Sequence, residues 1–175
     1  MVDIGVPVNE FYQYCRIGKV DMVKKAIKKI DSYPTFNMNI NYGFIEACKF
    51  SQLDIIELLF PLIDIYTVLG GFNCACMYNN LDVMKWIWFK KSAILIDVCH
   101  QTFILACERG QLKIIKWLIN CCNSIKTSKI TLEEGINTAS ENYQLHIVDY
   151  IKSIQINRNS RKNRIIVFIE NLVKN

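Results

Sequence analysis

The strongest constraint on this chain is a pattern that recurs five times. Each copy begins with a bulky apolar residue, has small residues three and four positions later in all but the first copy, and continues into an apolar stripe. The five starting residues, called anchors below, are Phe11, Phe44, Phe72, Phe103 and Ile136. Their spacings are 33, 28, 31 and 33 residues. A period near 33 residues with two helical patterns per copy is typical of helical repeat arrays.

Each copy is expected to form two short helices. The first contains the anchor, and the second contains apolar residues nine, eleven, twelve and fifteen positions after it. In the second and fourth copies these residues are Leu53, Ile55, Ile56 and Leu59, and Leu112, Ile114, Ile115 and Leu118. This spacing is that of a helix face and not of a strand. One helix pair is too small to bury its apolar faces, so successive copies are expected to share one continuous core.

The turn between the two helices is predicted seven positions after each anchor. Gly18 and Gly110 stand there in the first and fourth copies, where the left-handed backbone conformation commonly ends a helix. The other copies have Ser51, Asn79 and Tyr143 at this position. Asparagine adopts the left-handed conformation readily, whereas Tyr143 is a poor substitute, so we expect a distorted turn in the fifth copy.

The pattern resembles the ankyrin repeat. The segment FILACERGQLKIIKWLI, from Phe103 to Ile119, is similar to the ankyrin core L-x-x-A-A-x-x-G-x-L-x-I-V-x-x-L, with Phe for the first Leu and Cys for the second Ala. The resemblance covers about residues 9–153. It implies an all-α, ankyrin-like solenoid of about five helix–turn–helix repeats. No copy has the Thr-Pro-Leu-His start or the Asp-Gly hairpin tips of regular ankyrin repeats, so the loops between copies are expected to be short or irregular.

The copies set the expected domain boundaries. An irregular lead-in is expected over residues 1–8, the repeats over 9–155, and a C-terminal helix over 156–175, beginning with a polar break at 156–160. The C-terminal helix is amphipathic, so it is expected to cap the last repeat, with a partner-binding or membrane-surface role as the alternative. Within the array, Pro61 is predicted to close the second helix of its copy, and Thr131 with Glu134 is predicted to form a capping box.

The abundance of Asn, Ile, Lys and Tyr resembles that of ankyrin-like proteins of large DNA viruses. These include mimivirus-like viruses of amoebae and, as a related possibility, the multigene families of African swine fever virus. The resemblance implies an adaptor or decoy that binds a host protein in the host cytoplasm. No basic start followed by an apolar run is seen at the N-terminus, and the longest uncharged run, 65–81, is too short and polar to span a bilayer, so neither a secretory signal nor a membrane span is expected.

The eight cysteines are expected to be free thiols. Cys15, Cys48, Cys76 and Cys107 all stand four positions after an anchor, where a thiol packs as a small hydrophobic group. A disulfide framework is the alternative, and it is disfavoured because no secretory signal is expected. Zinc binding is disfavoured because neither Cys74-Ala75-Cys76 nor Cys121-Cys122 has the usual two-residue spacing.

No arrangement of residues predicts catalysis. The phosphate-binding loop and the nucleophile motifs are missing. His100 is expected in a connecting loop, and His146 falls in the register of a second helix, so neither has the neighbours of a catalytic triad. We therefore expect no enzyme activity, no cofactor and no metal.

A protein-binding surface is the favoured functional hypothesis. In ankyrin arrays the two positions before the turn face the concave side and vary freely. Here they are Arg16 and Ile17, Lys49 and Phe50, Met77 and Tyr78, Glu108 and Arg109, and Glu141 and Asn142. Lys49, Phe50, Met77, Tyr78 and Arg109 are expected to form a recognition patch of aromatic and cationic side chains. A second row, Leu58, Trp86, Trp117 and Tyr150, is expected to pack between copies, with a binding stripe as the alternative.

Two other functions stay open. The net charge of +5 is concentrated near the ends, at Lys24, Lys25, Lys28 and Lys29 and at Arg158, Arg161, Lys162 and Arg164. Nucleic-acid binding through these ends would be strongly salt-dependent, although such charge runs are usually solvated helix faces. A structural protein whose array associates with itself is the other alternative.

Overall fold

The computed structural model describes residues 8–28 and 36–157. Every regular element in these ranges is helical, which confirms the all-α expectation. The chain divides into two compact units, Met1–Thr102 and Phe103–Asn175, which are described separately below.

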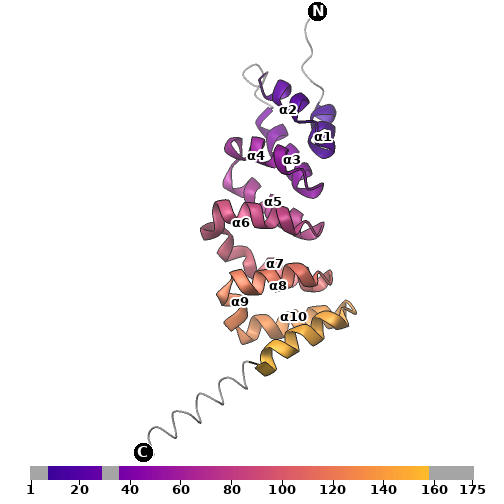
Figure 1. Cartoon of the computed structure of the whole chain (residues 1–175), viewed down its shortest axis with the longest axis vertical. Helices are drawn as coiled ribbons and strands as arrows, with labels where there is room; N and C mark the ends of the chain where they lie inside the picture. Colours follow the sequence, from indigo (N-terminus) through magenta and orange to yellow (C-terminus); the bar gives the residue numbers. More distant parts are fainter. Residues whose placement is uncertain (1–7, 29–35, 158–175) are drawn as a thin grey trace, which may run out of the picture. The chain divides into compact units, whose positions relative to one another are not determined.

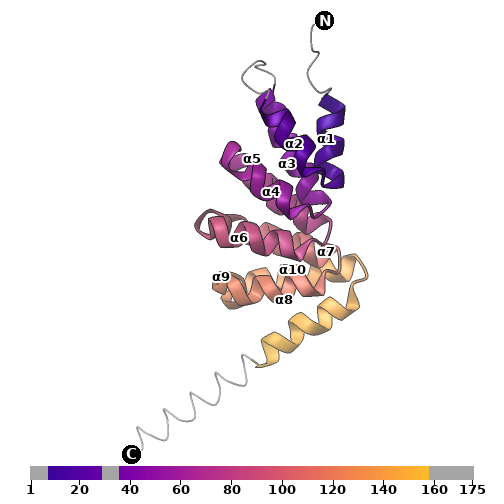
Figure 2. The same cartoon turned by 45° about the horizontal axis from the view of Figure 1, so that its top comes forward.

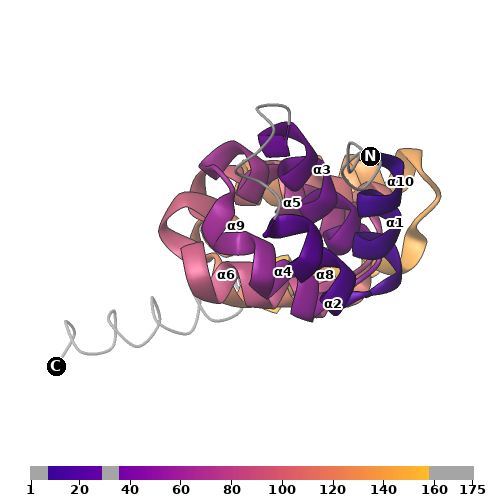
Figure 3. The same ribbon diagram turned by 90° about the horizontal axis from the view of Figure 1, so that it is seen from above.

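The first unit contains three successive helix pairs (Figure 1). They are α1 (Val8–Ile17) with α2 (Val20–Ile27), α3 (Phe36–Lys49) with α4 (Leu53–Leu59), and α5 (Ile65–Met77) with α6 (Leu81–Leu95). Within each pair the two helices pack on one another, and α1 contacts α3, which contacts α5. Figure 3 shows α1, α3 and α5 in the upper part of the view and α2, α4 and α6 below them.

The helix boundaries follow the sequence pattern closely in this unit. The helix α4 ends at Leu59, and a short 3-10 helix, η2 (Phe60–Leu62), contains Pro61, so Pro61 closes this helix as predicted. A second 3-10 helix, η3 (Ile96–Val98), leads into α7 (Cys99–Glu108), which crosses the boundary between the units. His100 therefore lies in a helix and not in the predicted connecting loop, because α7 begins four residues before its anchor.

The phenylalanine anchors of the first unit form the centre of its core. Phe11, Phe44 and Phe72 are buried, and so are the repeat cysteines Cys15 and Cys48 that follow the first two. In the second helices of the second and fourth copies, the positions eleven, twelve and fifteen after the anchor are buried as predicted. The position nine after the anchor is not: Leu53 is 37% exposed, because it lies at the first residue of α4, outside the buried face.

A glycine lies beneath each of three anchors, a feature that the sequence patterns did not predict. Gly43 precedes the second anchor, and a Cβ atom there would meet the Phe11 ring of the preceding copy at 2.5 Å and Cys15 Sγ at 2.9 Å. Gly71 has the same relation to Phe44. The sequence did contain a signal: in three copies a glycine directly precedes the anchor, within a predicted helix. Glycine inside a helix lowers its stability by about 1 kcal/mol relative to alanine, so its repeated use there indicates a packing reason.

The turns between paired helices are alike in all five copies. The residue seven positions after each anchor has a left-handed backbone, with φ of 74° at Gly18, 58° at Ser51, 60° at Asn79, 66° at Gly110 and 59° at Tyr143. The next amide then donates to the carbonyl five residues back, as from Gln52 to Ala47 (2.9 Å) and from Gln144 to Ala139 (2.7 Å). This is the hydrogen bond of a Schellman helix end.

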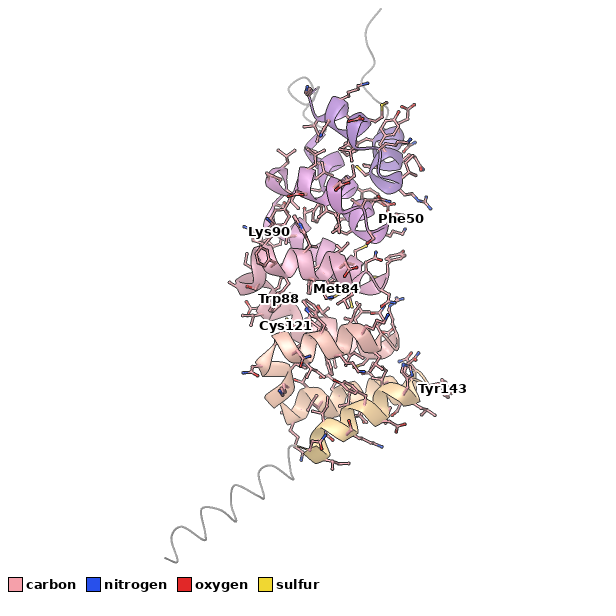
Figure 4. All side chains as sticks on the ribbon, in the orientation of Figure 1. Phe50, Met84, Trp88, Lys90, Cys121 and Tyr143 are labelled. Atoms are coloured by element: carbon pink, nitrogen blue, oxygen red, sulfur yellow. The ribbon has the colours of Figure 1, made fainter. Side chains whose placement is uncertain are left out.

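The predicted distortion at Tyr143 is therefore wrong. The fifth turn has the same φ and the same hydrogen bond as the others. The Tyr143 side chain is 90% exposed and points away from the helices (Figure 4), so solvent accommodates it. The cost that remains is the intrinsic penalty of a left-handed L-residue.

Replacing Tyr143 by glycine is expected to stabilise the protein by about 0.5–1 kcal/mol. The change removes the left-handed penalty of about 1–2 kcal/mol per residue, and part of this gain is offset by the greater freedom of glycine in the unfolded chain. Urea denaturation followed by circular dichroism measures the difference. As the opposite control, Gly110→Ala should destabilise, since alanine at its φ of 66° takes on the left-handed penalty that Tyr143→Gly removes. A loss of stability in Tyr143→Gly would contradict this account.

The second unit continues from Phe103 through the rest of α7. It contains α8 (Leu112–Cys121), α9 (Asn123–Thr127), α10 (Lys129–Glu141) and a helix over 145–157. The helix α9 was not predicted, and it packs at the end of α8 (Figure 2). Gly135 in α10 lies against the Phe103 ring, which repeats the arrangement of anchor and glycine in the first unit.

The start of α10 differs from the prediction. Ser128 is the N-cap, and its Oγ accepts a hydrogen bond from the Thr131 amide at 3.1 Å. Thr131 is thus the third residue of the helix and not its cap, so the capping box of Thr131 and Glu134 is wrong. The Ser128 hydroxyl supplies a cap three residues earlier, and the added turn includes the buried Thr131.

The ends of the array lie partly outside the described residues. Val8 already begins α1, and the lead-in before it is not described. The last described helix includes Ile156 and Asn157, so helix extends into the segment predicted as a polar break. The predicted C-terminal capping helix lies beyond residue 157, outside the described residues.

Candidate protein-binding surface

The paired residues before each turn lie at the exposed C-terminal ends of first helices. Ile17 ends α1, Lys49 ends α3 and Met77 ends α5, each with its partner residue beside it. In the first unit Ile17 is 56% exposed, Met77 42% and Tyr78 48%, while Lys49 and Phe50 are half-buried. These side chains are therefore held at the surface by helices whose other side forms the core.

Four of these side chains contact one another across three successive copies. The Arg16 guanidinium lies over the Phe50 ring, with its carbon 4.3 Å from the ring centroid. Lys49 Nζ lies 5.3 Å from the Phe50 centroid and 4.9 Å from the Tyr78 centroid. We call Arg16, Phe50, Lys49 and Tyr78 the cation–aromatic row; Phe50 is labelled in Figure 4, at the turn after α3. Each cation is attracted to the negative face of the aromatic ring beneath it, which favours this alternating arrangement.

Lys49 is the charged residue between the two aromatic rings of the row. A hydrogen bond with the Tyr78 side chain is the main cause that raises the pKa of its ammonium group, so Lys49 stays charged at neutral pH. Its Nζ also lies 3.8 Å from Glu46 Oε1 on the same helix. No ion pair joins Arg16 to a carboxylate among the described residues, so the row as a whole is positively charged.

Side-chain amides of the next copy hold the helix ends that carry the row. Gln52 Nε2 donates to the Arg16 carbonyl at 3.0 Å. Asn80 Nδ2 donates to the carbonyls of Cys48 and Lys49, both at 2.8 Å. These carbonyls are at a helix C-terminus, where they lack partners within the helix. The sequence patterns missed this contact, although an amide residue eight positions after the anchor in four of the five copies was a visible signal.

The predicted patch is only partly assembled by these contacts. Lys49, Phe50 and Tyr78 are in contact as described, and Met77 adjoins Tyr78. Arg109 belongs to the second compact unit and is not part of the row. Arg16, which the predicted patch omitted, takes the place beside Phe50, and its signal was its position five after the first anchor, equivalent to that of Lys49.

The remaining predicted partner-binding residues lie in the second unit. Glu108 and Arg109 are exposed at the end of α7, and Glu141 and Asn142 are exposed at the end of α10. Asn142 Nδ2 donates to the Thr138 carbonyl of its own helix at 2.9 Å. These side chains, all in the described part of the chain, form no contact comparable to the cation–aromatic row.

The second aromatic row shows packing between copies in the first unit. The Trp86 ring meets the Phe60 ring of the preceding copy edge-on, with centroids 5.0 Å apart. Lys90 Nζ lies 5.4 Å from the Trp86 centroid. In the second unit, Lys116 lies over Tyr150 at 5.2 Å. Leu58, Trp86, Trp117 and Tyr150 are all half-buried, and the Phe60 contact favours the packing interpretation for Trp86.

The cysteines are free thiols, and most of them are buried. All eight cysteines are free, and the four repeat cysteines are buried as predicted. Burial raises the pKa of Cys15 to about 12 and that of Cys48 well above its usual value, so these thiols stay protonated. Among the described residues, no three His, Cys, Asp or Glu side chains are placed to bind a metal ion. His146 Nε2 lies 3.1 Å from the Gly110 carbonyl oxygen.

No helix in the described ranges is both long enough and apolar enough to cross a bilayer. No family model, no curated protein and no solved structure matches this chain.

Proposed function

We propose that this chain is a non-enzymatic protein-binding module in which an ankyrin-like array of about five repeats presents the cation–aromatic row to a protein partner. The repeat arrangement is supported by the contacts of α1 with α3 and of α3 with α5, and by the common turn geometry of the five copies. The resemblance noted above suggests a viral adaptor or decoy that binds a host protein in the host cytoplasm.

The observation that carries the proposal is the row itself. It joins side chains from three copies at the two positions where the repeat does not fix residue identity. Arginine and tyrosine are enriched among the residues that dominate binding energy at protein interfaces. The amide contacts from Gln52 and Asn80 fix the supporting backbone, which lowers the entropy lost on binding.

The same geometry disfavours nucleic acid at this surface. Proteins that bind single strands stack bases on exposed aromatic faces. Here Phe50 is half-buried and is covered by both Arg16 and Lys49, and Lys49 also lies over Tyr78. The cations would have to leave the rings before a base could stack there.

Truncation of both rings tests the proposal. The full chain is immobilised, and proteins that it captures from a eukaryotic cell lysate are quantified by mass spectrometry. Truncation of an anchoring aromatic typically costs about 2 kcal/mol or more of binding, so Phe50→Ala with Tyr78→Ala should reduce capture of the specific partner by well over tenfold. The melting temperature should change little, since neither side chain belongs to the buried core.

A matched control removes two aromatic rings of the same unit outside the row. Tyr66 and Phe89 are 79% and 84% exposed, so Tyr66→Ala with Phe89→Ala lowers surface hydrophobicity without touching the row. Capture should persist in this variant. If every captured protein is retained equally by both double variants, the row is not the binding surface.

A further inference from the structure

Building on the proposed function, we propose that the cation–aromatic row recognises an acidic segment of a protein, with carboxylates of the segment meeting Arg16 and Lys49 and an apolar side chain covering Met77 and Tyr78.

The charges around the row call for acidic groups. Arg16 is exposed, and no carboxylate of the described residues forms an ion pair with it. Its guanidinium carbon lies 4.3 Å from the Phe50 ring centroid, and the five N–H donors of a guanidinium allow it to pair with a carboxylate while it lies against a ring. Lys49 has one carboxylate nearby, Glu46 at 3.8 Å, which is a long ion pair at the surface and therefore a weak one. Lys19, also exposed, adds a further positive charge near the same turn.

The spacing of the two cations limits the shape of the segment. Arg16 Cζ and Lys49 Nζ lie 4.3 Å and 5.3 Å from the same ring centroid, so the two charges are no more than about 10 Å apart. An extended chain advances by about 3.3 Å per residue. Two carboxylates that are two residues apart point to the same side of an extended segment and lie about 7 Å apart, which is within this limit.

The apolar part of the surface lies next to Lys49. Met77 and Tyr78 are 42% and 48% exposed at the end of α5, and the Tyr78 ring is held by Lys49 at 4.9 Å. In an extended segment, residues two positions apart point to the same side, so an apolar residue two positions after the second acidic residue would cover these side chains. The expected motif is thus a short extended segment with the pattern acidic, any residue, acidic, any residue, apolar.

Nuclear magnetic resonance titration of the full ¹⁵N-labelled chain tests this proposal at the level of single residues. The probes are a synthetic peptide with a Glu-Ser-Glu-Ser-Leu core between Gly-Ser ends, its Gln-Ser-Gln-Ser-Leu counterpart, and a short oligodeoxythymidylate. The acidic peptide should shift the backbone signals of the row residues, and its affinity should be about fivefold or more above that of the glutamine peptide, since two ion pairs distinguish them. Equal affinities, no shift at the row, or binding at the row by the oligonucleotide alone would overturn the proposal.

Charge reversal supplies the second arm. Arg16→Glu with Lys49→Glu keeps both rings and should lose the acidic peptide while gaining a Lys-Ser-Lys-Ser-Leu peptide. If the reversed variant does not give the signal dispersion of a folded chain, Arg16→Gln with Lys49→Gln is used instead. This neutral variant should lose binding of the acidic peptide without gaining binding of the basic one. If the ring truncations abolish capture of a protein but charge reversal leaves that capture unchanged, the protein-binding function stands and the acidic segment is wrong.

Discussion

Phe44→Ala is expected to lower the free energy of unfolding by about 3–5 kcal/mol, the range typical of a fully buried Phe. Phe44 has no exposed surface. Its ring packs against Gly71 of the next copy, and its centroid lies 6.3 Å from that of Phe60. Truncation would leave a cavity at the contact between two copies, where neither helix can move in without losing its other contacts. Since domains of this size are stable by about 5–15 kcal/mol, a large share of the total is at stake.

Urea denaturation followed by circular dichroism at 222 nm, a wavelength sensitive to helix, measures this loss. Tyr66→Ala is the matched control: it also removes an aromatic ring, but Tyr66 is 79% exposed, so a change within about 0.5 kcal/mol is expected. If Phe44→Ala were no more destabilising than Tyr66→Ala, the anchors would not be the core of the array.

Two adjacent glycines are expected to respond differently to alanine: Gly71→Ala should destabilise the protein and Gly70→Ala should not. In Gly71→Ala the new Cβ would clash with the Phe44 ring and would lie 3.0 Å from Cys48 Sγ, and both groups are fully buried and unable to yield. Overpacking of this kind costs typically about 1–3 kcal/mol. The higher helix propensity of alanine returns up to about 1 kcal/mol, so a clear net loss is expected.

In Gly70→Ala the helix propensity gain should dominate. Gly70 is exposed, and its new Cβ would meet only the Ile45 Cδ1 atom, at 3.2 Å, at the end of a flexible side chain. We expect the midpoint of denaturation to stay the same or to rise. Measuring both variants side by side separates close packing from helix propensity, because the two positions share one helix. Equal stability of the two variants would show that the anchor ring does not lie on Gly71.

The sequence alone determined the features that depend on local periodicity. The register of the five copies, the all-helical fold, the buried repeat cysteines and the helix end at Pro61 were all predicted, because hydrophobic spacing and proline act within a few residues of chain. The grouping of Lys49, Phe50 and Tyr78 in one patch was also predicted, since residues that break a regular repeat can be recognised in the sequence itself.

Only the tertiary structure decided the contacts between residues about 30 positions apart. It placed Gly43 and Gly71 beneath the preceding anchors, and it brought Arg16 over the Phe50 ring of the next copy. It also gave Tyr143 the same turn as Gly18, because the hydrogen bonds of the helix end fix the backbone while the side chain is free to lie in solvent. Periodicity shows which residues occupy equivalent positions, but which side chains touch depends on how closely two helices approach, and that distance is set by packing between copies.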